Sequence, residues 1–182
     1  TLYFGIILTK IQADYFFNKL LTSIAWKHDE LVVFGKHIIT KRKVALYGNS
    51  GLQYTYSNTK KTTLDWTAEL LELKKITEKI TGATYNSCLL NLYHTGQEGM
   101  AWHSDDEKEL LQNGSIASIS LGAERRFTFK HKITKETITI LLEHGSLLEM
   151  KGEIQLHWQH RLPPTKKIIE PRINITFRSI VI

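Results

Sequence analysis

A histidine and an aspartate stand two residues apart in the segment Trp102-His103-Ser104-Asp105. Side chains two residues apart on an extended strand point to the same side, so His103 and Asp105 can converge on one ion. An imidazole and a carboxylate suit Fe(II), and a second histidine would complete a set of three ligands that leaves positions open on the metal. His28 and Glu30 form a rival pair, which we expect to lie in an exposed turn after the first helix.

The segment near the C-terminus alternates strictly between polar and apolar residues. A period of two is that of a β-strand, so the polar residues share one face and the apolar residues share the other. Two arginines on one face could bind a dicarboxylate through charge-assisted hydrogen bonds. The alternative is an ordinary half-exposed strand with a solvated polar face. The polar face consists of Arg172, Asn174, Thr176 and Arg178, and the apolar face of Ile173, Ile175 and Phe177.

A third segment, Trp158-Gln159-His160-Arg161-Leu162-Pro163, supplies a histidine shortly before the arginine strand. Together with the His-x-Asp pair, the Arg-x-Asn-x-Thr-x-Arg strand and Asn91-Leu92-Tyr93, it resembles the AlkB family of Fe(II)- and 2-oxoglutarate-dependent dioxygenases, in the order that the family uses. The resemblance runs from about Val33 to the C-terminus. It is closest to the branch of AlkB-like enzymes that repairs alkylated duplex DNA.

This resemblance implies one Fe(II) ion, with 2-oxoglutarate and O₂ as cosubstrates. His157 competes with His160 for a place on the metal, but we expect His157 to pack or to lie at the surface. His144 has no motif support as a ligand. The ligands that the resemblance implies are His103, Asp105 and His160.

The resemblance also assigns residues to 2-oxoglutarate. Arg172 would bind the distal carboxylate of 2-oxoglutarate with help from Tyr93. The end of the cosubstrate that chelates the metal would be held by Asn91, Asn174 and Arg178. Arg178 is therefore counted, with the metal ligands, among the predicted catalytic residues.

An alkylated base in a duplex must leave the base stack to reach such a site. Val33-Phe34-Gly35-Lys36 resembles the hairpin that fills the vacated stack, and Phe34 would be its apolar wedge. The alternative makes Phe34 a core residue of a strand that starts at Leu31. Tyr54 matches a tyrosine that stacks on the flipped base, although Tyr54 and Tyr56 could simply be strand aromatics on one face.

Polar residues complete the predicted substrate site. Arg42 resembles a residue that supports binding near the lesion. Asp106 and Glu107 directly follow the metal carboxylate, and acidic groups there could favour the positively charged bases 1-methyladenine and 3-methylcytosine; surface solvation is the alternative for both. Three basic pairs could contact phosphates or merely be solvated, namely Lys60-Lys61, Arg125-Arg126 and Lys166-Lys167.

Helices and strands must position these residues. Apolar residues repeat at helical spacing from Ala13 to Trp26 and from about Asp65 to Thr81, with Gly82 as a stop for the second helix. The opening residues 2–8 are apolar, and without a preceding basic residue or a following cleavage site they predict a buried strand or core segment and not a signal peptide. Short alternating runs at residues 115–121, 126–130, 137–142 and 172–180 predict further strands.

These elements indicate a mainly β fold with flanking helices, a double-stranded β-helix or jelly roll. We expect one AlkB-like dioxygenase domain over residues 1–182. Its helical and substrate-binding N-terminal part would cover about residues 1–85, and its jelly-roll catalytic core about residues 86–182.

The composition limits the class of protein. The 182 residues, 42% of them hydrophobic, fit one globular domain, and the net charge of +6 favours an anionic partner such as nucleic acid. No apolar stretch reaches the roughly 18 residues of a membrane span, so we expect no membrane partner. We also expect a monomer. Cys88 is the only cysteine, which excludes an internal disulfide and a zinc site of several thiolates. We therefore expect a reducing intracellular compartment, the cytoplasm or a eukaryotic nucleus.

The expected function is oxidative demethylation of 1-methyladenine and 3-methylcytosine in DNA, with duplex DNA as the substrate. The reaction would convert 2-oxoglutarate to succinate and release formaldehyde. One alternative is a related dioxygenase that acts on RNA or on a protein side chain. Another is a catalytically inactive jelly roll that binds nucleic acid. A zinc hydrolase with the same three ligands would leave the two arginines of the C-terminal strand without a role.

Overall fold

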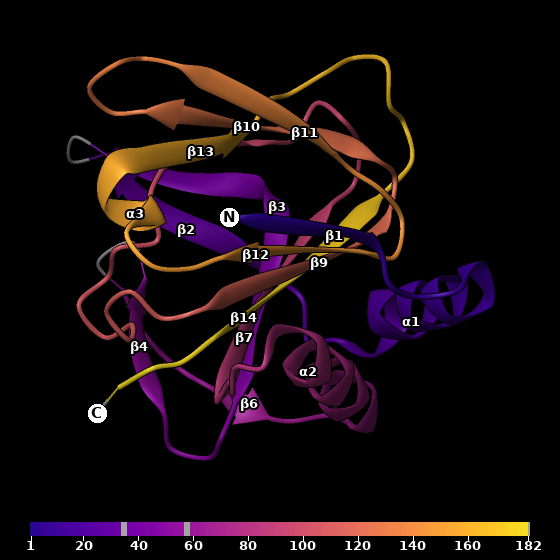
Figure 1. The fold of residues 1–182 in the computed structure, drawn as a ribbon. Helices are drawn as coiled ribbons and strands as arrows, with labels where there is room; N and C mark the ends of the chain where they lie inside the picture. The colour runs from indigo at the N-terminus through magenta and orange to yellow at the C-terminus, as the bar shows by residue number, and fades with distance from the viewer. Residues whose placement is uncertain (34–35, 57–58, 182) are drawn as a thin grey trace.

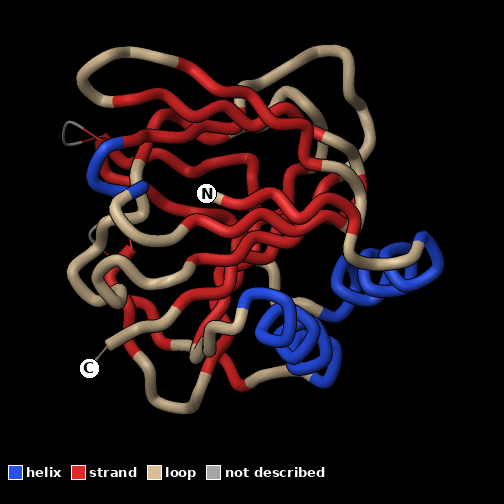
Figure 2. The backbone as a smooth tube through the Cα atoms, in the orientation of Figure 1, coloured by secondary structure: helices blue, strands red, loops and turns tan. Residues whose placement is uncertain are grey.

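The computed structural model describes residues 1–33, 36–56 and 59–181 (Figure 1). Two antiparallel sheets face each other, and two long helices lie together beside the larger sheet (Figures 1 and 2). The elements are, in chain order, β1 (Leu2–Ile6), α1 (Lys10–Ser23), β2 (Lys27–Val33), β3 (Lys36–Gly48), β4 (Gln53–Tyr56), β5 (Thr59–Thr62), β6 (Leu64–Asp65), α2 (Ala68–Thr81), β7 (Ser87–Tyr93), β8 (Met100–His103), β9 (Ile116–Gly122), β10 (Arg125–His131), β11 (Thr137–Leu142), β12 (Ser146–Met150), α3 (Ile154–His157), β13 (Trp158–Leu162) and β14 (Arg172–Arg178).

The larger sheet has the strand order β1-β12-β9-β14-β7-β3-β2, and β6 adds a short parallel pairing to β3. The smaller sheet has the order β11-β10-β13-β8, while β4 and β5 form a separate hairpin. This arrangement is the jelly roll that the strand pattern predicts. Strands from both predicted parts of the chain build the larger sheet, so residues 1–85 contribute to the framework of the core. In the described part of the chain, no helix is both long and apolar enough to cross a membrane.

Two groups of buried side chains hold these layers together. One group packs the helices on the outer face of the larger sheet and includes Phe16 and Leu20 of α1 and Leu70 and Leu73 of α2. The other group fills the space between the sheets and includes Phe129. Every strand in the middle of the larger sheet is therefore covered on both faces, which explains why such strands are almost fully buried.

Side-chain caps decide where the helices begin. The hydroxyl of Thr9 accepts a hydrogen bond from the N–H of Gln12, and Thr67 caps α2 in the same way. Apolar spacing alone predicts α1 three residues too late at both ends, because it reports the buried face and not the cap. The predicted stop at Gly82 is confirmed, since this residue adopts a φ of 70° in the left-handed region.

Strand β14 lies between β9 and β7 in the middle of the larger sheet. Its apolar residues pack under the helices, and its polar residues point into the space between the sheets. The alternative of a solvated polar face is wrong, because Arg172 is only 2% exposed and Arg178 only 6%. Because β14 is covered on both faces, its buried polar groups cost free energy unless they find hydrogen-bond or ionic partners.

Two expectations about the N-terminal region are wrong. Strand β1 is an edge strand that pairs with β12, and its apolar side chains Leu2 and Ile6 are 48% and 58% exposed. An apolar run predicts a buried strand only when a second layer covers it. His28 and Glu30 are exposed as expected, but they lie within strand β2 and not in a turn.

Candidate metal centre and adjoining pocket

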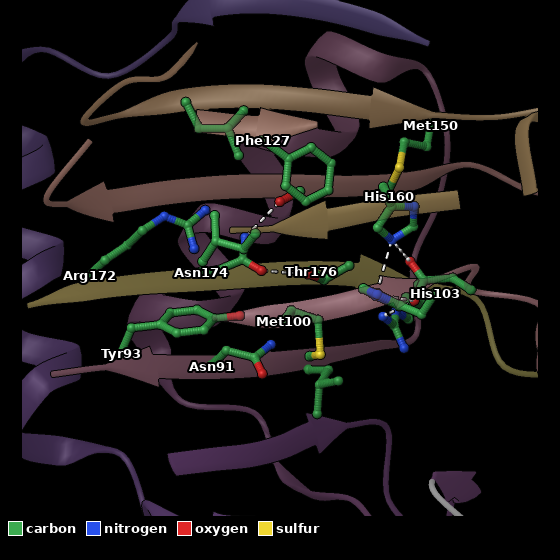
Figure 3. A pocket seen from close by; sticks show the side chains of 16 residues that line it. Asn91, Tyr93, Met100, His103, Phe127, Met150, His160, Arg172, Asn174 and Thr176 are labelled. Carbon is green, nitrogen blue, oxygen red and sulfur yellow. Dashed lines mark hydrogen bonds and ion pairs between the residues drawn. The ribbon is translucent and has the colours of Figure 1, made fainter. Parts of the chain in front are cut away.

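A pocket lies between the two sheets, and its walls come from both (Figure 3). His103 and His160 stand at one end of it and Arg172 at the other. Side chains of β7 and β14 form the wall from the larger sheet, and side chains of β8, β10 and β13 form the opposite wall. The lining residues include Asn91, Tyr93, Met100, His103, Asp105, Phe127, His160, Arg172, Asn174, Thr176 and Arg178.

At one end, His103, Asp105 and His160 offer three ligand atoms that all lie within 4.8 Å of one another. His103 and His160 are register partners on the neighbouring strands β8 and β13, and their Nε2 atoms are 3.1 Å apart. The carboxylate of Asp105 lies 4.0 Å from Nε2 of His103 and 3.7 Å from Nε2 of His160. Two imidazoles and one carboxylate converging on one point are the donor set of a non-haem Fe(II) site.

Hydrogen bonds hold the His103 side chain and the backbone that carries Asp105. Nδ1 of His103 lies 2.9 Å from the carbonyl oxygen of Ala101, so Nδ1–H donates there and the Nε2 lone pair faces the other ligands. The N–H of Asp105 donates to Oε1 of Gln155 at 3.0 Å. The hydroxyl of Ser104 donates to the carbonyl of Trp158 at 2.9 Å. These bonds tie the loop after β8 to the segment that leads into β13.

Burial and nearby charges keep Asp105 and His160 in the protonation states that bind a metal. Burial works to raise the pKa of Asp105, but the nearby Arg178, His160 and His103 outweigh burial and hold the pKa below its usual range. Burial lowers the pKa of His160 to about 4, so its imidazole is neutral at ordinary pH. An ionised carboxylate beside a neutral imidazole is the state that binds a divalent metal.

At the other end of the pocket, Arg172 is buried without an acidic partner among the described residues. Its Nη2 donates to the hydroxyl of Ser120 at 2.9 Å, and its guanidinium carbon lies 5.5 Å from the centre of the Tyr93 ring. Within the described ranges, neither its Nε nor the buried Oδ1 of Asn91 has a hydrogen-bond partner. A buried cation of this kind costs free energy unless an anion joins it. The pocket therefore fits a carboxylate at the Arg172 end and a metal ion at the other.

The remaining predicted pocket residues line the same space. Asn174 donates through Nδ2 to the hydroxyl of Ser118 at 2.6 Å and to the carbonyl of Ile119 at 3.1 Å. The hydroxyl of Thr176 donates to Oδ1 of Asn174 at 3.1 Å. Ser118 and Ser120 were not predicted, although their period-two spacing in a predicted strand could have indicated one polar face.

The predicted substrate residues lie in different surroundings. Phe34 falls outside the described residues, and Tyr54 lies on β4 with an undescribed side chain. Arg42 is 4% exposed; it pairs with Asp29 and donates to the sulfur of Met100, which lines the pocket. Asp106 and Glu107 line a second cavity of about 320 Å³, which Asp105 also borders.

The rival histidines and one predicted basic pair can also be placed. His157 lies at the surface, where its Nε2 is 3.5 Å from a carboxylate oxygen of Glu153. His144 pairs with Asp14 and accepts from the N–H of Gly122, away from the metal group. The Arg125-Arg126 pair is not a surface pair, because Arg125 is only 1% exposed. Strand β10 begins at Arg125, one residue before the predicted start, so Arg125 and Arg126 point to opposite sides of the strand.

Comparisons with known proteins agree with this geometry. The family model of the 2OG-Fe(II) oxygenase superfamily matches residues 1–178. The chain is 38% identical over 189 aligned residues to the DNA oxidative demethylase ALKBH2 of Bos taurus, covering 98% of this chain and 68% of that protein. Its identity to the Homo sapiens protein of the same name is 36%, covering 98% and 73%.

A second group of relatives carries a different name. The alpha-ketoglutarate-dependent dioxygenase alkB homolog 3 of Homo sapiens is 38% identical over 189 aligned residues, covering 98% of this chain and 65% of that protein. Among solved structures, "The structure of OsALKBH1" superposes with a TM-score of 0.66 at 14% identity, covering 97% of this chain and 95% of that one. At this identity the likeness concerns the fold alone.

Proposed function

The chain belongs to the 2OG-Fe(II) oxygenase superfamily, and from this membership we propose that it removes alkyl groups from bases in DNA by oxidation. It is an Fe(II)/2-oxoglutarate-dependent dioxygenase, and relatives that cover nearly all of it are named DNA oxidative demethylases. The observation that carries the proposal is the pocket itself. The group of His103, Asp105 and His160 faces the same space as Arg172, which has no acidic partner among the residues that the structure describes.

The residues of this pocket divide the binding work. His103, Asp105 and His160 would hold Fe(II), since their free ligand atoms converge. Arg172 would bind the distal carboxylate of 2-oxoglutarate beside Tyr93. The opposite end of the cosubstrate would lie near three polar side chains that face the same space, namely Asn91, Asn174 and Arg178.

When bound, iron and 2-oxoglutarate supply the oxidation of an N-methyl group by O₂, with succinate, CO₂ and formaldehyde as products. The chain's own part is to bind, orient and exclude water. Apolar side chains such as Phe127 and Leu162 close the pocket walls between the sheets. Arg178 keeps Asp105 ionised, since its Nη2 donates to Oδ1 of that carboxylate at 2.8 Å.

We propose duplex DNA carrying 1-methyladenine or 3-methylcytosine as the substrate. The net charge of +6 supports a polyanionic partner, and exposed basic residues such as Lys166 and Lys167 are available for phosphate contacts. Asp106 and Glu107 border a cavity next to Asp105, where acidic groups would favour a cationic base. Phe34, Arg42 and Tyr54 stay as predicted substrate contacts. We further propose a monomer that works in a reducing compartment, the cytoplasm or the nucleus.

The proposal is tested by mixing the protein with Fe(II), ascorbate, 2-oxoglutarate and an oligonucleotide that contains one 1-methyladenine, and by following the mass of the strand. We expect the loss of one methyl group, faster in the duplex than in the single strand, and no loss when EDTA replaces Fe(II) or when 2-oxoglutarate is omitted. Succinate formed without any change in DNA would keep the dioxygenase but overturn the substrate, and the same assay on methylated RNA or on protein would follow. An absence of succinate under every condition would leave only the inactive nucleic-acid-binding alternative.

A further inference from the structure

Arg125 is a fully buried arginine to which the mechanism above gives no role. It begins strand β10 and lies on the same face of that strand as Phe127 and Phe129, which is the face toward the space between the sheets. Its Nη2 donates to two backbone carbonyls, that of Glu98 at 3.0 Å and that of Pro163 at 2.9 Å. Complete burial of this long cation costs free energy, so its contacts must offset that cost.

The two carbonyls belong to separate segments that close the Arg172 end of the pocket. Glu98 lies in the loop that follows Tyr93, and Pro163 directly follows Leu162; both Tyr93 and Leu162 line the pocket. The two segments also bond to each other, since the N–H of Gly96 donates to the carbonyl of Ile168 and the N–H of Thr165 donates to the carbonyl of Gly96, each at 2.8 Å. Arg125 therefore bridges the two segments from inside.

The charge of Arg125 reaches the same end of the pocket. In the described part of the chain, neither Arg125 nor Arg172 forms an ion pair with an acidic side chain. Burial and then the charge of Arg125 lower the pKa of Arg172 to about 10, against an opposing effect of Tyr93. The carboxylate of Glu98 also acts on the charge of Arg125, but it accepts from the N–H of His94 and forms no ion pair with either arginine among the described residues. The two buried guanidinium groups therefore make the Arg172 end of the pocket positive.

We propose that Arg125 is a positioning residue for the distal carboxylate of 2-oxoglutarate. It fixes the loop after Tyr93 against the connection after Leu162, and it adds a second positive charge behind Arg172. This inference rests on the proposed placement of 2-oxoglutarate, with its distal carboxylate at Arg172. Arg125 does not line the pocket, so it acts through Tyr93 and Arg172 and not by touching the cosubstrate.

The test compares two ligands on Mn(II)-loaded protein, each by titration calorimetry. N-oxalylglycine carries both the chelating end and the distal carboxylate, whereas oxalate carries only the chelating end. The variants are Arg125→Met, which loses charge and bridge, and Arg125→Lys, which keeps the charge but cannot form the two-carbonyl fork. Arg126→Met is the matched control, because Arg126 is the next residue on β10 and is exposed on the opposite face.

We expect Arg125→Met to weaken N-oxalylglycine binding by about tenfold or more, because the second positive charge and the bridge that holds Tyr93 and Arg172 in place are both lost, while oxalate and Mn(II) binding stay within about twofold of wild type. Arg125→Lys should fall between, and Arg126→Met should match wild type. Equal weakening of both ligands would reveal a general structural role and overturn the proposal. If Arg125→Met does not fold, Arg125→Lys decides, and an unchanged ratio of the two affinities overturns it. A wild-type protein that binds oxalate but not N-oxalylglycine would instead contradict the proposed placement of 2-oxoglutarate.

Discussion

Nη2 of Arg178 donates a hydrogen bond to Oδ1 of Asp105 at 2.8 Å, and both side chains are buried. Arg178 ends strand β14 of the larger sheet, whereas Asp105 follows strand β8 of the smaller sheet. His103 and His160 both belong to the smaller sheet. The ion pair therefore connects the metal carboxylate to the opposite sheet, and the metal group depends on the correct packing of the two sheets against each other.

This ion pair predicts a rescue between two substitutions in the metal-free protein. Arg178→Met leaves a buried carboxylate without its cation, and removal of one partner of a buried pair costs about 3–5 kcal/mol. The added change Asp105→Asn removes the orphaned charge, so the double variant should be more stable than Arg178→Met alone. Urea unfolding in EDTA gives the free energy of unfolding of the wild type, the two single variants and the double variant. Strictly additive losses would show that the pair is not coupled.

Of the two neighbouring histidines His157 and His160, only His160 should affect metal binding. His160→Ala removes a buried ligand atom that lies within 4.8 Å of the other two, so Mn(II) affinity should fall at least about 100-fold. His157→Ala removes an exposed imidazole of the same segment and should leave the affinity unchanged. Anaerobic Fe(II) titration or Mn(II) paramagnetic resonance provides the measurement. Equal losses in both variants would contradict the assignment of His160.

Local patterns explain why the main parts of the site could be predicted. The alternation along β14 is visible in the sequence because its two faces meet different surroundings, the core under the helices and the polar pocket. His103 and Asp105 are close in sequence and stay close in space. The prediction of His160 as a metal ligand required the family resemblance, because His160 and His103 are paired on strands that are far apart in the chain.

The supporting residues could not be predicted, since their roles depend on contacts between distant segments. Phe127 and Phe129 alternate in the sequence, but the predicted strand begins at Arg126 and leaves Arg125 outside it. Only the pairing of Arg125 with Leu142 of β11 extends the alternation to Arg125 and shows that its side chain points inward. Arg42 similarly finds its buried partner Asp29 through the pairing of β2 and β3. The exposure of β1 depends on its place at the edge of the sheet.

The reactivity of the Cys88 thiol reports how often the core beneath the pocket opens. This thiol is completely buried in strand β7, and burial raises its pKa far above the usual range. Because the thiolate is the reactive form, alkylation by iodoacetamide at pH 8 should be at least about 100-fold slower in the native protein than in urea, given ordinary domain stability. Mass spectrometry counts the adducts, and Cys88→Ser provides the background. Rapid labelling of the native protein would show that β7 opens readily.

Substitution of Gln155 tests how the carboxylate of Asp105 is oriented toward the metal. Its Oε1 accepts the N–H of Asp105 at 3.0 Å, and its backbone belongs to α3, which leads into the strand of His160. Gln155→Leu keeps the size of the side chain but leaves that N–H without its acceptor, which costs about 1–3 kcal/mol when the group is buried. Loss of such outer contacts lowers metal affinity by about 10–100-fold, and we expect that range for Mn(II).

The matched variants separate orientation from packing. Gln155→Glu keeps an acceptor oxygen, so it should recover most of the Mn(II) affinity that Gln155→Leu loses. Gln159→Leu makes the same chemical change on β13, where no side-chain hydrogen bond of Gln159 is seen within the described residues, and it should bind Mn(II) as wild type does. If Gln155→Leu and Gln159→Leu bind the metal equally well, the hydrogen bond to Asp105 is not what orients the carboxylate. In that case the Arg178 ion pair alone would have to hold Asp105 in place, and the rescue by Asp105→Asn should then be larger.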